Sequence, residues 1–101
     1  MDPLEIRFKP KSRLHISQAS SFYASRADGR LVARFLRDLD EALEQLSAFP
    51  ESGAESHRKT RRLVLKRFPY SIYYRVHPKF IEVYAVLHGM RDPRFLKRES
   101  Q

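Results

Sequence analysis

The chain has 101 residues, enough for one domain with a modest core and too few for two. It contains no cysteine, which excludes disulfides and thiolate metal sites and favours a reducing compartment. Its net charge is +8, it lacks a signal-peptide run, and no stretch approaches the roughly 20 apolar residues that span a bilayer. We therefore expect a single cytoplasmic domain over residues 1–101, with no membrane association and with nucleic acid or an acidic protein as partner.

The first expected elements are a strand and a helix. Residues 4–9 alternate apolar and charged side chains, the pattern of a half-buried strand, and Pro10 ends the run. From Ser12 the apolar spacing changes to three and four, which predicts a helix. The residues on its apolar face are Ser12, Ile16, Ala19, Phe22 and Tyr23. Asp28 and Gly29 then mark a turn.

A second and stronger helical pattern follows this turn. Its apolar stripe consists of Val32, Phe35, Leu36, Leu39, Ala42, Leu43 and Leu46. On the opposite side, Arg34 and Arg37 stand four residues before Asp38 and Glu41, a spacing that predicts two ion pairs. Two helices joined by a short turn form an antiparallel hairpin with one shared apolar side, which the rest of the chain must cover.

The remainder of the chain predicts a loop, three strands and a tail. Residues 49–56 contain Pro and Gly and are expected to form the loop. Three strand-like runs follow, at residues 62–66, 70–76 and 80–88. The last run has apolar residues at both parities, so we expect it inside the sheet. Residues 90–101 form a basic C-terminal tail.

The order β-α-α-β-β-β predicts the fold class. We expect an α+β domain in which the antiparallel helical hairpin packs on one face of a small, mainly antiparallel twisted sheet. The other face of the sheet then receives much of residues 56–75, which carry seven Lys or Arg and no acid. Strand alternation sends Tyr70, Ile72 and Tyr74 under the helices. The side chains expected on the open face are Arg62, Lys66, Tyr73, Arg75 and Tyr84.

Four segments, taken in order, carry a resemblance to a known family. They are the helix pattern around His15 and Tyr23, the helix exit LSAFPESG (46–53), the basic strand RRLVLKRFPYSIYYRV (61–76) and the ending VYAVLHGMRDP (83–93). Together they resemble the ParE/RelE superfamily of bacterial toxins from type II toxin–antitoxin systems. The ending is similar to that of ParE-like members, whereas His15 stands where the family usually has Asp.

The resemblance implies one of two activities on the same fold. ParE-like members are described as inhibitors of DNA gyrase without a reaction of their own, and RelE-like members are ribosome-dependent mRNA endoribonucleases. A nuclease would hold phosphate with Arg62 and Arg75 and move protons with Tyr84 or His88. The Tyr or His-Tyr of a RelE-like tail is missing here. We therefore expect a ParE-like toxin that is not an enzyme, with the nuclease as the main alternative and a decayed toxin as a third.

The resemblance and the charge also indicate partners. We expect no metal and no cofactor, because no His, Asp or Glu cluster has ligand spacing. An acidic, partly disordered segment of a cognate antitoxin is expected to fold onto Arg61, Arg62, Lys66, Tyr73 and Arg75. DNA gyrase is the expected target, and the candidate contacts are Arg91, Arg94, Lys97 and Arg98 of the tail. Neither helix has a basic recognition face, so sequence-specific DNA binding by this chain alone is not expected.

Overall fold

The computed structural model describes residues 2–26 and 29–89. The helices are α1 (Pro10–Arg26) and α2 (Gly29–Ala48), and the strands are β1 (Glu5–Phe8), β2 (Ala54–Glu55), β3 (Arg61–Val64), β4 (Tyr70–Val76) and β5 (Phe80–His88). A short 3-10 turn, His57–Lys59, separates β2 from β3. The predicted order β-α-α-β-β-β is confirmed, with β2 as an additional two-residue strand inside the predicted loop.

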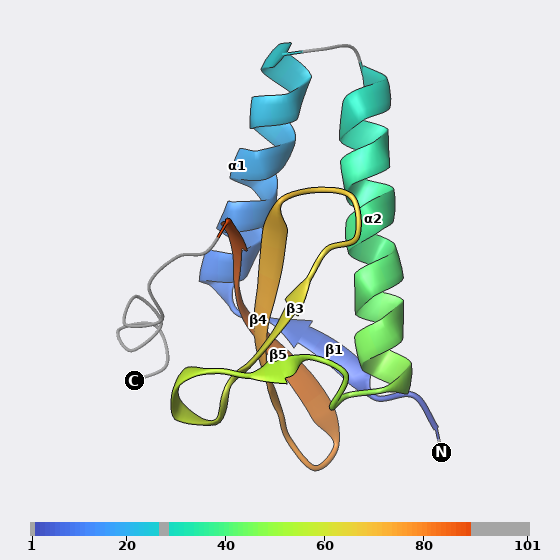
Figure 1. Cartoon of the computed structure of the whole chain (residues 1–101), viewed down its shortest axis with the longest axis vertical. Coiled ribbons are helices and arrows are strands. Elements are labelled where there is room, and N and C mark those ends of the chain that lie inside the picture. The colour runs from blue at the N-terminus through green and yellow to red at the C-terminus, as the bar shows by residue number, and fades with distance from the viewer. Residues whose placement is uncertain (1, 27–28, 90–101) are drawn as a thin grey trace.

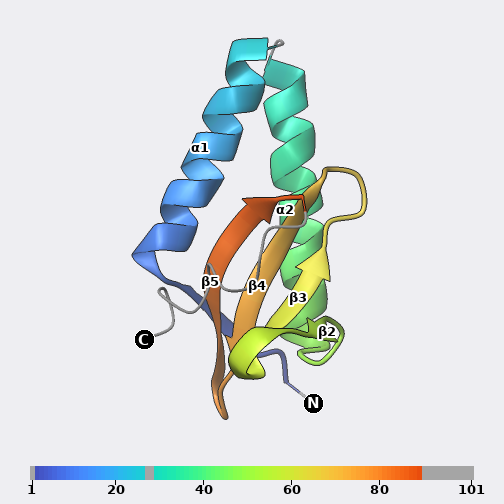
Figure 2. The ribbon, with the colours of Figure 1, turned by 60° about the vertical axis from the view of Figure 1, so that its left-hand side comes forward.

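The five strands form one sheet in the order β1-β5-β4-β3-β2. β1 runs parallel to β5, and all other neighbours are antiparallel, which confirms the α+β fold with a mainly antiparallel sheet. β5 lies between β1 and β4, as its apolar residues at both parities predicted. Figure 1 shows α1 and α2 side by side, and Figure 2 shows the hairpin extending beyond the end of the strands.

The chain passes from β1 to α1 at Pro10. Proline suits the first helical position, where its missing N–H has no partner to lose, so α1 begins two residues before the predicted start at Ser12. The Ser12 hydroxyl is fully buried and donates to the Lys9 carbonyl at 2.7 Å. The Lys9 N–H in turn donates to the Val83 carbonyl of β5 at 3.0 Å. These two hydrogen bonds fix the start of α1 against β5.

The core lies between the helical hairpin and the sheet. Burial of one large apolar side chain stabilises the folded state by about 1.5–3 kcal/mol. Tyr70 belongs to this core, so the prediction that alternate residues of β4 lie under the helices is confirmed. Phe22 and Leu36 lie at the edges of their helical stripes and remain 45% and 38% exposed. The core side chains with no exposed area are Phe35, Leu46, Ile72, Tyr74, Ile81 and Val83.

Tyr74 holds the segment that leaves α2. Its hydroxyl donates to the Pro50 carbonyl at 2.8 Å and accepts the Gly53 N–H at 2.9 Å. A Cβ on Gly53 would lie 2.6 Å from that hydroxyl oxygen, so the close approach requires glycine. Burial raises the pKa of Tyr74, and the hydrogen bond from Gly53 opposes this rise. The predicted loop is therefore fixed against the end of the core.

The two ion pairs predicted on α2 do not form. Asp38 is only 2% exposed, and its Oδ2 accepts the backbone N–H groups of Arg67 and Phe68, each at 2.9 Å. Glu41 pairs with Arg67, with Nη1 3.1 Å from Oε2. The loop between β3 and β4 has N–H groups that no strand satisfies, and Asp38 satisfies two of them. The prediction that these acids pair with the arginines four residues before them was therefore wrong.

Candidate partner-binding surface

The face of the sheet opposite the helices collects side chains from the basic stretch. Directly paired residues on neighbouring strands share a face. Arg62 pairs with Tyr73, Tyr73 with Ala85, and Arg75 with Glu82. Because the alternate residues of β4 lie in the core under the helices, these five residues project from the opposite face.

A β-bulge adds Tyr84 to this face. Tyr73 pairs with Ala85 and Tyr74 with Val83, so Tyr84 is the extra residue of β5 at this point. Two cations approach the Tyr84 ring: Lys9 Nζ lies 4.8 Å and Arg75 Cζ 5.4 Å from the ring centroid. The residues that we call the open-face cluster are Arg62, Tyr73, Arg75 and Tyr84.

The Tyr84 hydroxyl is suited to donating a hydrogen bond and not to removing a proton. The side chain is 3% exposed. Burial raises the pKa of Tyr84, the Glu82 carboxylate raises it further, and the Arg75 guanidinium opposes both. A general base works best when its pKa lies near the operating pH, and even an unperturbed tyrosine titrates at about 10. Tyr84 therefore stays protonated at neutral pH.

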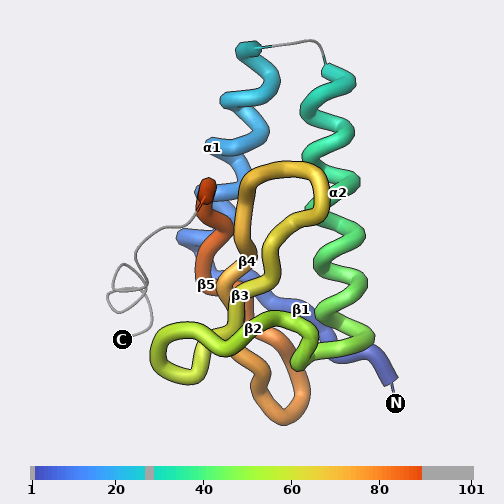
Figure 3. Tube along the Cα trace, viewed as in Figure 1, coloured from blue at the N-terminus to red at the C-terminus, as the bar shows by residue number. Residues whose placement is uncertain are grey.

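Arg75 connects the open face to the turn His57–Lys59. Its Nη2 donates to the Arg58 carbonyl at 2.7 Å. Arg58 and Lys59 have φ of 51° and 64°, left-handed backbone that costs roughly 1–2 kcal/mol per non-glycine residue. Such strain persists only where the surroundings impose it, and the bond from Arg75 is one contact that does so. Figure 3 traces this turn across the end of the sheet.

Tyr73 lies on the predicted face but is buried there. It packs with Ala85 and Leu87 in a small second cluster and is 1% exposed. Within the described part of the chain, no hydrogen-bond partner exists for its hydroxyl, for Arg75 Nε or for His57 Nε2. A buried polar group without a partner costs about 1–3 kcal/mol. These three atoms are buried, and the described part of the chain leaves them unsatisfied.

Two other predicted contact residues lie away from the open face. Arg61 turns to the edge of the sheet, where Nη1 donates to the Gly53 carbonyl at 2.8 Å and Nη2 lies 3.8 Å from Glu55. Lys66 is exposed in the loop between β3 and β4, beyond the end of the strand that the sequence predicted. The basic stretch is therefore divided among the open face, the sheet edge and this loop.

The structure brings together only part of the alternative nuclease set. Arg62, Arg75 and Tyr84 share the open face. His88 pairs with Tyr70 on the helix-facing side, where the two rings meet edge to face at 5.2 Å. Four residues of strand, about 13 Å, separate His88 from Tyr84 along β5. His88 and the arginine pair therefore do not form one site.

The predicted target contacts fall outside the residues that the structure describes. They are Arg91, Arg94, Lys97 and Arg98, in the tail 90–101. The geometry of residues 2–26 and 29–89 does not bear on these positions. The assignment of the target contact to the tail therefore stays a prediction.

Sequence reasoning missed the contribution of β1 and its continuation to this surface. Lys9 approaches Tyr84, and Arg7 lies over Phe80, with Cζ 4.1 Å from the ring centroid. Both cations belong to the charged side of the alternating run 4–9. The parallel pairing of β1 with β5 places that side next to the outward residues of β5. The alternation indicated that Arg7 and Lys9 lie on one side of the strand. Nothing in the sequence indicated that this strand pairs with β5.

Two further kinds of site can be assessed within residues 2–26 and 29–89. In these ranges no three His, Asp or Glu side chains are arranged to hold a metal ion. Neither helix there combines the length and the apolar character needed to cross a membrane. The arginine, lysine and tyrosine side chains of the open face are the functional groups that the structure does bring together.

Sequence comparison relates the chain to known proteins. The family described as "ParE toxin of type II toxin-antitoxin system, parDE" matches residues 6–93. Toxin ParE2 of Mycobacterium tuberculosis, found in two strains, is 27% identical over 82 residues. This similarity covers 81% of the chain and 78% of the relative.

Solved structures share the fold. A chain titled "Chromosomal ParDE TA system from P. aeruginosa" superposes with a TM-score of 0.75 at 19% identity, covering 86% of this chain and 97% of that chain. A chain of the toxin–antitoxin complex RelBE2 from Mycobacterium tuberculosis superposes with a TM-score of 0.59 at 21% identity, covering 87% and 93%. At these identities the superpositions show the fold alone. The family match spans most of the sequence, and the chain therefore belongs to the ParE toxin family of type II toxin–antitoxin systems.

Proposed function

We propose that this chain is a toxin that inhibits DNA gyrase in the cytoplasm and that a cognate antitoxin neutralises it. The observation that carries this proposal is the family match over residues 6–93. The match includes the whole of the ParE-like ending VYAVLHGMRDP (83–93), which supports this proposal over a RelE-like nuclease. The proposed inhibition arises from binding and needs no reaction at the toxin itself.

The chemistry of the open-face cluster supports binding over cleavage. Cleavage of RNA without a metal requires a group that removes the 2′-hydroxyl proton. Burial keeps Tyr84 protonated, and His88 lies on the other face of the sheet. What the open face offers instead is charge and hydrogen-bond donors, from Arg62, Arg75 and Lys9. These groups fit a carboxylate-rich partner.

The proposed antitoxin contact lies on this face. Charge-assisted hydrogen bonds from arginine to carboxylate are roughly twice as strong as neutral ones. A carboxylate at this face would pair with the half-buried Arg75 guanidinium, two residues along β4 from Tyr73. An acidic, partly disordered segment gains such contacts as it folds along the sheet. The target contact is proposed to lie elsewhere, on the four cations of the tail.

The alternative function is a RelE-like, ribosome-dependent mRNA endoribonuclease. One observation favours it: Arg62, Arg75 and Tyr84 share a face, so a phosphate clamp and a proton donor lie together. In this arrangement His88 points the other way, and the Glu82 carboxylate on the open face is held by His77, with Oε1 3.1 Å from Nε2. We therefore place it second.

The experiment that separates the two functions is induction of the chain alone, with supercoiling of a plasmid and integrity of mRNA scored in the same cells. We expect supercoiling to fall, or cleaved DNA to accumulate, while mRNA stays intact. The same comparison with Arg75→Ala identifies any use of the open face in catalysis. Ribosome-dependent mRNA cleavage that disappears in Arg75→Ala would overturn the gyrase proposal in favour of the nuclease.

A further inference from the structure

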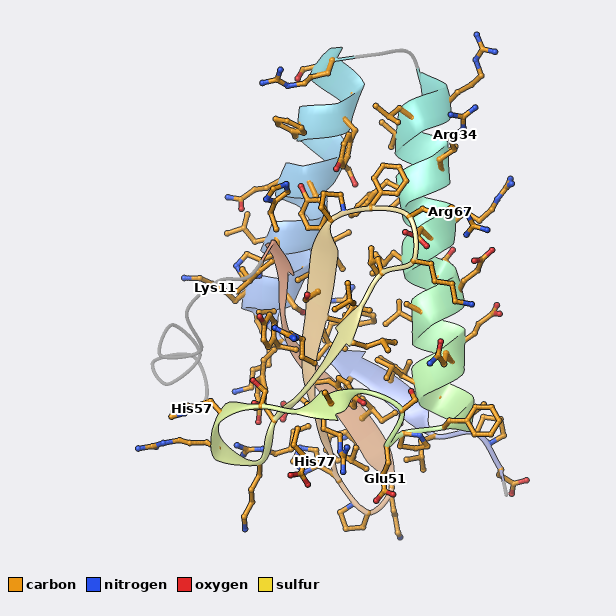
Figure 4. All side chains as sticks on the ribbon, in the orientation of Figure 1. Lys11, Arg34, Glu51, His57, Arg67 and His77 are labelled. Carbon is orange, nitrogen blue, oxygen red and sulfur yellow. The ribbon has the colours of Figure 1, made fainter. Side chains whose placement is uncertain are left out.

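A second surface lies beside α2, at the loop between β3 and β4. It is a hollow of about 560 Å³. Three arginines, Arg34, Arg37 and Arg67, line it together with the apolar side chains of Leu31 and Phe68. Figure 4 shows Arg34 and Arg67 on the same side of the molecule, along α2. Arginine next to aromatic and aliphatic side chains is the composition typical of protein interfaces.

The arginines of α2 lack partners because their expected acids are used elsewhere. Asp38 accepts two backbone N–H groups of the loop, and Glu41 pairs with Arg67. Among the residues that the structure describes, neither Arg34 nor Arg37 takes part in a hydrogen bond or an ion pair. Both are exposed and three residues apart, so they lie on one flank of the helix. Two guanidinium groups thus stand unpaired at one hollow.

The apolar side of the hollow is rigid. Phe68 packs edge-on against Tyr23 and Phe35, with ring centroids 5.0 Å and 5.5 Å apart. Asp38 holds the backbone of Phe68 by a bond of 2.9 Å. Neither the ring nor its backbone is free to collapse into the hollow when a ligand arrives. A ligand therefore meets a preformed apolar wall beside two free cations, which lowers the entropic cost of binding.

The charges around the hollow select a protein over a nucleic acid. Asp38 and Glu41 line the same hollow as the arginines, and Asp40 and Glu44 are exposed on the same helix. A nucleic-acid backbone has a phosphate on every nucleotide and places some of these charges against the acids, whereas a peptide can place uncharged side chains there. A peptide segment with one or two carboxylates next to an apolar side chain matches the arrangement, because each guanidinium donates hydrogen bonds to one carboxylate and the apolar side chain covers Phe68.

We propose that this hollow is a second docking site for the cognate antitoxin, which places acidic side chains on Arg34 and Arg37 and an apolar side chain against Phe68. This inference rests on the proposed function. The loop between β3 and β4 joins the two surfaces, since Val64 ends β3 on the open face and Arg67 already lines the hollow three residues later. An antitoxin segment lying along the open face reaches the hollow by crossing this loop. The antitoxin then contacts the toxin on both sides of the loop.

The test measures binding of the purified antitoxin to the purified full-length chain. The test variant is Arg34→Gln with Arg37→Gln. The control is Arg26→Gln with Lys79→Gln, which removes the same charge from two exposed positions that do not line the hollow. We expect the test variant to weaken binding at least about tenfold, mainly through faster dissociation, and the control to change it by less than about threefold. Circular dichroism and melting temperature confirm that both variants stay folded.

Further arms separate the possible outcomes. Arg34→Lys with Arg37→Lys keeps the positive charge but removes the bidentate guanidinium. We expect this variant to bind more tightly than the Gln variant and less tightly than wild type. If test and control variants bind alike, the hollow is not an antitoxin contact, although the proposed function survives. If the wild-type chain fails to bind the antitoxin at all, both the proposed function and the docking site at the hollow are overturned. If duplex DNA binding is lost in the test variant while antitoxin binding is kept, the site serves nucleic acid and the inference is overturned.

Discussion

Tyr73 and Tyr74 are neighbours in β4 that face opposite sides of the sheet. Both are buried, with exposed fractions of 1% and 0%. The Tyr74 hydroxyl has a donor in Gly53 and an acceptor in Pro50, whereas the Tyr73 hydroxyl has no partner in the described part of the chain. The Tyr74 hydroxyl is therefore satisfied within the chain, whereas the Tyr73 hydroxyl is a buried polar group that the described residues leave unsatisfied.

The same difference divides the basic stretch into two roles. Arg61 and Arg67 hold loops, because Arg61 binds the Gly53 carbonyl and Arg67 binds Glu41. Arg75 of the same stretch instead lies near Tyr84 on the open face, where Lys9 from the N-terminal run also approaches the ring. A run of positive charge in the sequence thus contains both cations that hold loops and cations that lie on the open face, for which we propose antitoxin binding, and the strand register separates them.

The largest expected effect is loss of the core on the helix-covered side. Leu39 is 3% exposed in this core, and Leu39→Ala should cost about 2–5 kcal/mol, a large part of a small domain's stability. Growth arrest, antitoxin binding and melting temperature should fall together.

Replacing Arg91, Arg94, Lys97 and Arg98 by Gln should instead remove growth arrest and leave antitoxin binding and melting temperature near wild type. A tail variant that stays fully toxic would show that the target contact lies elsewhere.

The two tyrosines of β4 provide a matched pair of substitutions. Tyr74→Phe leaves the Gly53 N–H and the Pro50 carbonyl without their shared partner and should cost about 1–3 kcal/mol in unfolding free energy. Tyr73→Phe removes a hydroxyl that has no partner among the described residues, so stability should stay the same or rise. Denaturant unfolding of both variants measures the difference. Equal losses would contradict the distinction between the two faces.

Alkaline pH should weaken the helix-covered face. Burial and the neighbouring Tyr70 raise the pKa of Tyr23 to about 12. An unfolded tyrosine titrates at about 10, so the folded state holds this proton more tightly. The resulting stabilisation is fully present below about pH 10 and is lost as the pH rises toward about 12. Melting temperatures across this range should therefore fall, and Tyr23→Phe should make the fall shallower. An unchanged slope would exclude Tyr23 as the cause.

The fold and the composition of the open face follow from local patterns, and the exceptions have a common physical cause. Period-two alternation placed Tyr70 and Ile72 under the helices, and the structure agrees. Asp38 looked like a surface acid on a charged helical flank, yet it satisfies backbone groups 29 and 30 residues away. The approach of Lys9 to Tyr84 also needs the parallel pairing of distant strands. Long-range pairing of this kind leaves no periodic signal in the sequence.

The smallest expected effect concerns the strained turn beside the open face. Arg58→Gly removes the left-handed strain at φ 51° and should change stability by no more than about 1 kcal/mol, in the stabilising direction. Ala33→Gly, at an exposed position inside α2, is the control and should cost about 1 kcal/mol. Thermal unfolding compares the two. If Arg58→Gly destabilises as much as the control, the turn is not under strain.

The role of the open face as an attracting surface for an acidic antitoxin has one direct measurement, the association rate at increasing salt. The range over which charges act falls from about 30 Å at 0.01 M to about 8 Å at 0.15 M ionic strength. We predict that association slows steeply over this range while dissociation changes little, and that Arg62→Gln with Arg75→Gln reduces the slope. A wild-type association rate that stays flat from low to high salt would contradict the assignment of this surface.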